Sequence, residues 1–540
     1  MSGTAAEQLD ESIESGGSAG IAGRAQGAQA AEDAEAERGR RAALKAGALA
    51  VAGLLLPSLA GAQGARRKGP GSDVPRPFGT PATLNLDPID PTAAWVSPEL
   101  RLVRRITMGL TDAEGQRARQ LGYEGYLDYH LAADQIDDGA VTQYVATTWS
   151  YTTQNGDALY NIEQGTLQTQ LTNAAIYRSA FSTRQLKERL VEFWTDHFNI
   201  DIQKVGYLKV LDDRDVVRQY AMTTFPQLLR ASAHSPAMLS YLDQTISRRG
   251  SPNQNYAREI MELHTLGVNG GYTQNDVAEL SRVLTGWTIA GRGVFTFDPN
   301  LHDYGAKTVL GITIPATTQA SVGAAAQNEG EGIINVLVAH VSTATFVSQK
   351  MLRYFLRYDP TDEQVAQVAS VYLTTGGDIK SMLRAVLSRQ NVMSAPAKFK
   401  RPYHYVVSAV RALAPTVANV STLAGQISVA GQAPYTYDTP DGYPDSAEYW
   451  SGNILPRWNS ASFLANANSA SSVQFNVTPF MTPATPSAIV GAIDRACFGG
   501  EMPQRLRDEL VAYVSVNPTS TTRVRETIGL ALSSSTFQYF

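Results

Sequence analysis

The chain has 540 residues, of which 43% are hydrophobic and 18% charged, a composition typical of a globular protein long enough for one large domain or several smaller ones. Its formal net charge of -5 provides no basic excess to displace counterions from phosphates, so nucleic acid is excluded as an expected partner. With one cysteine, Cys497, the chain cannot form an intramolecular disulfide, and a packed core must supply its stability.

Residues 1–62 resemble a twin-arginine export signal with a long preamble. Arg40 and Arg41 precede an apolar run from Ala46 to Leu56, and the small residues ending at Ala62 suit cleavage there. The apolar run is too short to span a membrane. An alanine-rich low-complexity leader is the alternative, but it does not account for the paired arginines. We expect a periplasmic or extracellular protein with no transmembrane span in the mature chain.

Residues 63–94 are rich in proline, glycine and arginine and lack an apolar period, so we expect a flexible linker. From residue 95 to 540 the patterns predict a mainly α fold: one large multi-helix domain with a small β-hairpin insertion at about 289–314 and long loops. Near its start, Thr111 is placed to cap a helix that begins at Asp112.

A helix predicted to open with a capping box of Ser182 and Gln185 contains the first chemical cluster. Carboxylates repeat at four-residue steps along one side of it: Glu188, Glu192 and Asp196. His197 follows near the C-terminus, where the helix dipole favours a protonated imidazole. Two interpretations are open: a solvated acidic stripe, or a site in which His197 is a ligand or general base.

The densest set of reactive side chains lies in two predicted helices joined by a glycine-rich elbow. Ser251 and Gln254 are placed as a capping box for the first helix, and Gly267 supplies the left-handed residue that ends it. The second helix has a capping box of its own: Thr273 and Asp276.

Polar groups share one face of that first helix: Asn255, Glu259 and Glu262, beside Arg258 and His264. Glu262 lies in the C-terminal third of the helix, where a carboxylate opposes the helix dipole and needs a compensating partner. Either it forms an internal ion pair with Arg258 or with Arg282 of the second helix, or it joins Glu259 in a catalytic or metal-binding pair.

Between about residues 289 and 314 the helical period gives way to alternation, which predicts one small pair of strands, 294–297 with 308–313. The connecting loop holds a third polar cluster: His302, Asp303 and Lys307. It is either a rim or lid over the paired helices or a set of surface hydrogen bonds. Residues 319–332 are small and predict a mobile loop.

Helical patterns then continue to the end of the chain: 332–340, 344–358, 362–375, 379–387, 403–413, 460–468, 487–497, 501–514 and 521–532. They are interrupted at 432–458 by a long loop rich in aromatic and proline residues, including Trp450. Such a loop either stacks on sugars and seals a cleft, or plugs the core without regular structure.

Six segments are informative in combination: Arg104 to Gly109, FWTDHF at 193–198, NQNYAREIMELHTLGV at 253–268, GYTQNDVAELSRVLTGW at 271–287, HDYGAKTVLG at 302–311 and DGYPDSAEYW at 441–450. Together they resemble a large bacterial family of exported proteins catalogued as domain of unknown function 1800. The resemblance implies a mostly helical fold, a twin-arginine signal, and an exported partner similar to phosphatases and sulfatases. Similar sequences have an aromatic residue at His264, so we do not expect it to be a ligand.

Two functions are consistent with these features. The first is an exported hydrolase or lyase acting on an extracytoplasmic polymer, with these acid–base residues: Glu259, Glu262, His197, His302 and Asp303. Its substrate-binding residues would be Asn255, Arg258, Arg282, Trp287, Lys307 and Trp450. A variant holds a divalent metal on Glu192, Glu259, Glu262 and His197, since carboxylates on facing helices build such sites.

The second is a non-catalytic helical scaffold that binds an exported partner or a glycan through the aromatic loop. The two hypotheses differ in whether the polar clusters meet at one place in the fold. Catalysis predicts that the three polar clusters surround one pocket, whereas a scaffold predicts that each carboxylate faces its own arginine in a filled interior.

Overall fold

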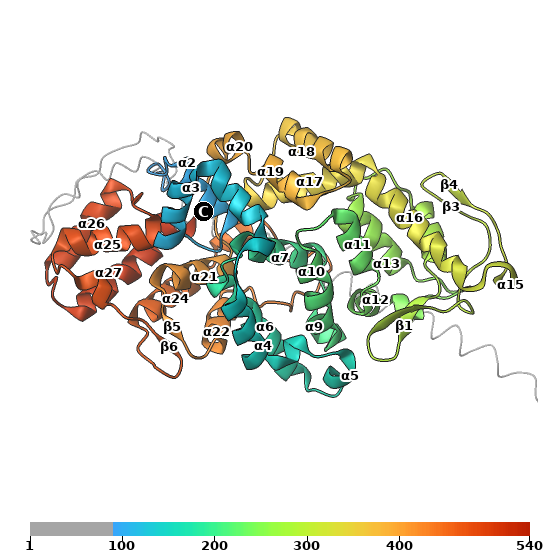
Figure 1. Cartoon of the computed structure of the whole chain (residues 1–540), viewed down its shortest axis with the longest axis horizontal. Helices are drawn as coiled ribbons and strands as arrows, with labels where there is room; N and C mark the ends of the chain where they lie inside the picture. Colours follow the sequence, from blue (N-terminus) through green and yellow to red (C-terminus); the bar gives the residue numbers. More distant parts are fainter. Residues whose placement is uncertain (1–89) are drawn as a thin grey trace, which may run out of the picture. The chain divides into compact units, whose positions relative to one another are not determined.

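The computed structural model describes residues 90–540, which belong to one compact unit (Figure 1). The predicted export signal at 1–62 and nearly all of the predicted linker lie outside the described residues. The described chain is predominantly helical with a few short antiparallel strand pairs, which confirms the mainly α fold class.

Thirteen helices form the first part of the described chain: α2 (Pro98–Ile106), α3 (Asp112–Leu131), α4 (Gly139–Thr148), α5 (Gly156–Leu159), α6 (Gln164–Phe181), α7 (Gln185–His197), α8 (Ile202–Val205), α9 (Leu208–Asp212), α10 (Arg218–Tyr220), α11 (Phe225–Ala233), α12 (Pro236–Tyr241), α13 (Gln254–Glu259) and α14 (Gln274–Val283). Thr111 caps α3, as predicted, by accepting a hydrogen bond from the backbone of Glu114.

The second part of the described chain has these helices: α15 (Gln319–Val322), α16 (Gln327–Ala339), α17 (Val341–Phe355), α18 (Asp362–Thr375), α19 (Ile379–Val386), α20 (Arg389–Ser394), α21 (Pro402–Leu413), α22 (Ser421–Val429), α23 (Ala447–Ser451), α24 (Ile454–Asn466), α25 (Pro486–Phe498), α26 (Gln504–Ser515) and α27 (Thr521–Ser533). Most of them overlap a predicted helical pattern, but α15, α20, α22 and α23 were not predicted. Two loop predictions were wrong. Most of 319–332 is helical, and the predicted aromatic loop is irregular only to about residue 446, where α23 and then α24 begin.

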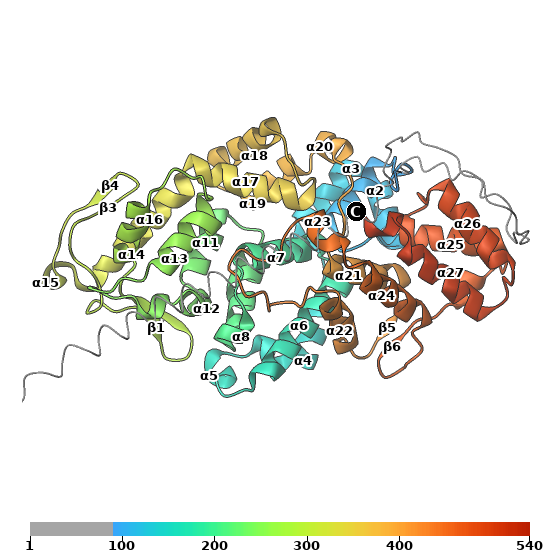
Figure 2. The same ribbon diagram turned by 180° about the vertical axis from the view of Figure 1, so that it is seen from behind.

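The core consists of two main hydrophobic clusters. The larger one includes side chains of α2, α3, α7, α11 and α17 to α19, and the other is formed mainly by α21 and α24 to α27. Helix α7 lies in the middle of the fold, beside α3 and α6, in both views (Figures 1 and 2). Its Trp194 and Phe198 are fully buried, which fixes the opposite, polar side of the helix in place.

Two hairpins replace the single strand pair that alternation predicted. Strand β1 (Trp287–Ala290) pairs with β2 (Val294–Phe297), and β3 (Lys307–Val309) pairs with β4 (Ile312–Ile314). The reason is local: glycines with positive φ close each turn, at Gly293 and Gly311, so each strand pairs with its neighbour in the chain. A third pair joins β5 (Thr416–Val417) to β6 (Val473–Gln474).

Two predicted helix starts were displaced. Asn253 caps α13 instead of Ser251, because its side chain accepts a hydrogen bond from the backbone of Asn255. Ser182 and Gln185 do not form a capping box, since Gln185 donates to the Ser182 carbonyl and begins α7 itself. The first helix of the elbow ends in a π-helical segment, η5 (Ile260–Thr265), and Gly267 has a φ of 80°, as predicted for its end.

Within the described residues, no single helix is long and apolar enough to cross a membrane. The bent pair formed by residues 319–339 and 341–355, with an angle of 62° between its halves, reaches that length and composition only when the two are taken together.

Candidate functional site

Four segments that are far apart in the sequence enclose a cavity of about 310 Å³. Asp196 and His197 line it from the end of α7, and Lys350 from α17. Arg401, just before α21, and the loop 441–445 complete it. This volume is at the lower end of the range for small-molecule sites. The cavity unites two of the motifs identified in the sequence, FWTDHF and DGYPDSAEYW.

The loop that covers the cavity is held by hydrogen bonds to its backbone. Asn199 donates to the carbonyls of Tyr437 and Thr439 at 2.8 and 2.7 Å, and Tyr241 donates to that of Asp438 at 2.7 Å. Trp450 is buried and donates to the carbonyl of Pro444 at 2.7 Å. The predicted substrate-binding role of Trp450 is therefore replaced by a structural one, because its indole fixes the loop from behind.

Arg401 joins two acids of α7. Its Nη1 lies 2.5 Å from Asp196 Oδ2, and its Nη2 lies 2.8 Å from Glu192 Oε1. Asp445, which also lines the cavity, is paired with Lys398, whose ammonium lies 2.8 Å from Asp445 Oδ2. Burial raises the pKa of the Asp196 carboxyl, while Arg401 acts in the other direction and favours its charged form.

Lys350 differs from these cations because it forms no ion pair or hydrogen bond with any residue of the described chain. Burial lowers the pKa of its ammonium to about 8, although Asp196 and Asp441 favour the charged form. A lysine in such surroundings exchanges its proton near neutral pH and is suited to act as a general base.

His197 is a neutral imidazole. Its Nε2 donates to the backbone carbonyl of His264 at 3.1 Å, and its buried Nδ1 has no partner among the described residues. Burial and then the charge of Lys350 lower its pKa well below the usual range. At this helix end desolvation therefore outweighs the attraction of the dipole for a protonated imidazole.

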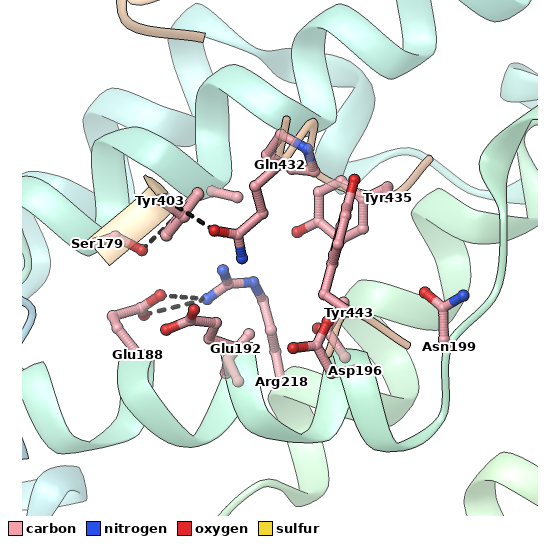
Figure 3. A pocket seen from close by; sticks show the side chains of 14 residues that line it. Ser179, Glu188, Glu192, Asp196, Asn199, Arg218, Tyr403, Gln432, Tyr435 and Tyr443 are labelled. Atoms are coloured by element: carbon pink, nitrogen blue, oxygen red, sulfur yellow. Dashed lines mark hydrogen bonds and ion pairs between the residues drawn. The ribbon is translucent and has the colours of Figure 1, made fainter. Parts of the chain in front are cut away.

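The acidic side of α7 faces protein and not solvent (Figure 3). Glu188 lies 3.1 Å from Arg218, and Glu192 also accepts from Arg189 at 3.0 Å and from Tyr354 at 2.7 Å. A second cavity of only about 50 Å³ remains beside these groups. The interpretation as a solvated acidic stripe was therefore wrong, since each of these glutamates is paired with arginine inside the fold.

Neither predicted ion pair of Glu262 forms within the described chain. Glu262 accepts a hydrogen bond from Tyr272 at 3.2 Å, while Arg258 donates to Gln274 at 3.0 Å. Burial and the neighbouring charge of Glu262 raise the pKa of Glu259, and Asp441 of the loop contributes in the same direction. The predicted carboxylate pair exists, but neither member lines the cavity under the loop.

The third polar cluster fastens the loop before β3 to the helices beneath it. His302 is fully buried, with Nδ1 donating to the carbonyl of Thr285 at 2.7 Å and Nε2 3.3 Å from Glu329. The same glutamate accepts from Lys307 at 2.7 Å. Asp303 is bound by Arg282, which also contacts Glu279. These groups are fully engaged with one another.

The remaining predicted ligand residues lie apart from the cavity. Trp287 is fully buried against Gly330 of α16, where a side chain would overlap the indole. Asn255 is exposed at the start of α13, with its side chain donating to the Leu242 carbonyl at 3.4 Å. In residues 90–540, no three His, Cys, Asp or Glu side chains are grouped to hold a metal ion. The four predicted metal ligands are therefore not brought together as such a group in the described residues.

Convergence is partial. Of the predicted acid–base residues only His197 lines the cavity of about 310 Å³, together with Asp196 from the same motif. The prediction missed Lys350, Arg401 and Asp445. One sequence signal was available for Lys350, because it lies one turn after Phe346 in a helix whose one other charged residue is Arg353.

Fold and site together define a predominantly helical protein whose pocket combines lysine, arginine and aspartate side chains from separate segments. The chain belongs to the family described as Protein of unknown function (DUF1800), whose sequence model matches residues 101–539. This confirms the family expected from the six motifs. No curated protein and no solved structure matches the chain.

Proposed function

We propose that the protein is exported by the twin-arginine route and acts on an extracytoplasmic polymer as a hydrolase or lyase, with Lys350 as the general base. Export is supported by Arg40 and Arg41 and the apolar run that follows them. The single observation behind the activity is the ammonium of Lys350, which lines the cavity and has no partner among the described residues, whereas Arg401 of the same cavity is paired with Asp196 and Glu192.

The acid–base role follows from the state of this lysine. With a pKa of about 8, about one Lys350 side chain in ten is neutral at pH 7. In a hydrolase, the neutral amine takes a proton from the attacking water; in a lyase, it takes a proton from the carbon next to a carboxyl group while the bond to the leaving oxygen breaks. His197 lines the same cavity, and its buried Nδ1 has no hydrogen-bond partner among the described residues.

A scaffold that binds an exported partner is the second candidate. It is favoured by the pairing of Glu188 and Glu192 with Arg218, Arg189 and Arg401, which is how the acids of a structural core are expected to be satisfied. This pairing accounts for the acids of α7. It leaves Lys350 without a role.

The test is turnover of a polymer panel: a neutral glucan, a polyuronate, chitin fragments and peptidoglycan. New reducing ends measure cleavage, and an ultraviolet-absorbing carbon–carbon double bond identifies a lyase. We expect Lys350→Met to lower turnover by about 10²- to 10⁴-fold. Lys380→Met is the matched control, because Lys380 is partly exposed on α19 and lies 3.6 Å from Asp134. Equal turnover in both variants would disprove the role of Lys350, and no turnover by the native protein favours the scaffold.

A further inference from the structure

A third cavity, of about 390 Å³, is lined by α2, by residues just before it, by residues 395–397 and by the last two residues of the chain. Arg101, Arg104 and Arg105 line it from α2, and Pro396 and Phe540 line it from the other side. It belongs to no part of the site proposed above. Three arginines within about one helical turn of α2 therefore line a single cavity.

Arg105 is a buried cation that has no ion pair among residues 90–540. Only 4% of the residue is exposed, and Nη2 donates to the carbonyl of Pro396 at 2.5 Å. Nη1 is buried and has no hydrogen-bond partner in the part of the chain that the structure describes. Burial lowers its pKa to about 9, and the charges of Arg101 and Arg189 act in the same direction.

The two neighbouring arginines both have hydrogen-bond partners within the described chain. Arg104 lies 2.7 Å from Glu501 and donates to the carbonyl of Phe498. Arg101 donates to the carbonyls of Trp95 and Met393, so described groups satisfy its hydrogen bonds but do not balance its charge. A buried charge that is not balanced is strongly unfavourable, and proteins retain one where something else supplies the opposite charge.

Aromatic residues complete the cavity wall: Trp95, Tyr539 and Phe540. Asp90 is its one lining acidic side chain among the described residues, and its Oδ1 accepts hydrogen bonds from the backbone and hydroxyl of Thr92 at 2.8 and 2.7 Å. The lining therefore combines arginine side chains with aromatic side chains against which the carbon skeleton of a ligand can pack.

We propose that this cavity binds a small organic anion, whose carboxylate or phosphate group pairs with the guanidinium of Arg105 and whose body packs against the aromatic side chains. The guanidinium fork matches either oxyanion. The ligand balances the charge that the described residues leave unbalanced. This site is independent of the reaction proposed at Lys350.

Calorimetric titration of the full chain tests the proposal with four probes: inorganic phosphate, acetate, glucose 6-phosphate and benzoate. Phosphate and glucose 6-phosphate against acetate and benzoate distinguish the two oxyanions. We expect saturable binding of at least one organic probe with one site per chain, and a loss of about 10- to 100-fold in affinity in Arg105→Gln. Arg105→Lys keeps the charge but not the fork, so it should also weaken binding.

Arg411→Gln is the matched control. Arg411 is also held only by backbone carbonyls, those of Gly109 and Ala180, and burial lowers its pKa to about 10, but it does not line this cavity. Its affinity for the probes should equal that of the native protein. Absence of binding by the native protein, or equal binding by both Arg105 variants, would overturn the proposal. Because the native titration needs no variant, a misfolded Arg105→Gln protein would not prevent that conclusion.

Discussion

Gly442 lies directly against the backbone carbonyl of Asp196, so close that a side chain at Gly442 would overlap the carbonyl oxygen. Its φ of 75° is in the left-handed region that favours glycine. The contact seats the loop on the end of α7 and places Asp441 and Tyr443 at the rim of the cavity. The shape of the site therefore depends on the absence of a single β-carbon.

Replacing Gly442 by alanine should displace the loop. We expect Gly442→Ala to lower the free energy of unfolding by about 2–4 kcal/mol, because left-handed strain adds to overlap with Asp196. Gly376→Ala is the control for strain alone, since Gly376 has a φ of 65° and open space around it. It should lose only about 1 kcal/mol. Chemical denaturation measures both, and equal losses would show that the close contact is unimportant.

Arg401 should be among the most important cations for stability. Arg401→Met leaves Asp196 and Glu192 without this partner inside the fold, so we expect a loss of about 3–5 kcal/mol. In Arg505→Met, removal of the exposed contact with Glu509 should cost no more than about 0.5 kcal/mol. Urea denaturation of the two variants measures the difference. Similar losses would contradict a buried ionic network at the cavity.

Lys350 should reduce stability at neutral pH. Its pKa is lower in the folded chain, about 8 against 10.5, so the unfolded chain binds more protons between these values and stability rises with pH there. The penalty is fully present below pH 8, and Lys350→Met should remove about 1–3 kcal/mol of it. Thermal unfolding at pH 7 and pH 10 measures the gain, which should shrink at the higher pH. A variant less stable than the native protein at pH 7 would refute this.

His264 should make the protein sensitive to acid. Burial lowers its pKa to about 3, so the unfolded chain gains a proton near pH 6.5 that the folded chain takes up only near pH 3. Stability is therefore lost as the pH falls through this window. His264→Phe also removes Nε2, which has no partner among the described residues. The effect of this substitution on the free energy of unfolding should be about 2 kcal/mol more stabilising at pH 5 than at pH 8. An effect that does not change with pH would show that His264 is not buried as a neutral group.

Local features of the fold were predictable because their causes are local. The helix α18 begins and ends where its apolar period does, and the capping box of Thr273 and Asp276 opens α14 as expected. The strand pairs were harder, since turns at Gly293 and Gly311 decided which strands met. Sequence order alone did not distinguish one hairpin from two.

The site was predicted only in part because its contacts join distant segments. Arg401 reaches Asp196 across 205 residues, and the rim residue Asp441 comes from a third segment. The motifs indicated which stretches matter, but Glu259 and His302, which received acid–base roles, do not line the cavity that Lys350 and Arg401 line. The periodicity of the sequence predicts which face of its helix a side chain occupies. Tertiary packing decides which other helix or loop that face contacts.

The reactivity of Lys350 as a function of pH is the most direct test of the proposed site. Trace labelling with acetic anhydride, followed by mass spectrometry of the peptide that contains Lys350, gives the pH at which its amine becomes half reactive. We expect the amine of Lys350 to be half reactive near pH 8, well below the ordinary lysine value of 10.5. A midpoint that coincides with the ordinary lysine value would contradict a general base at this position.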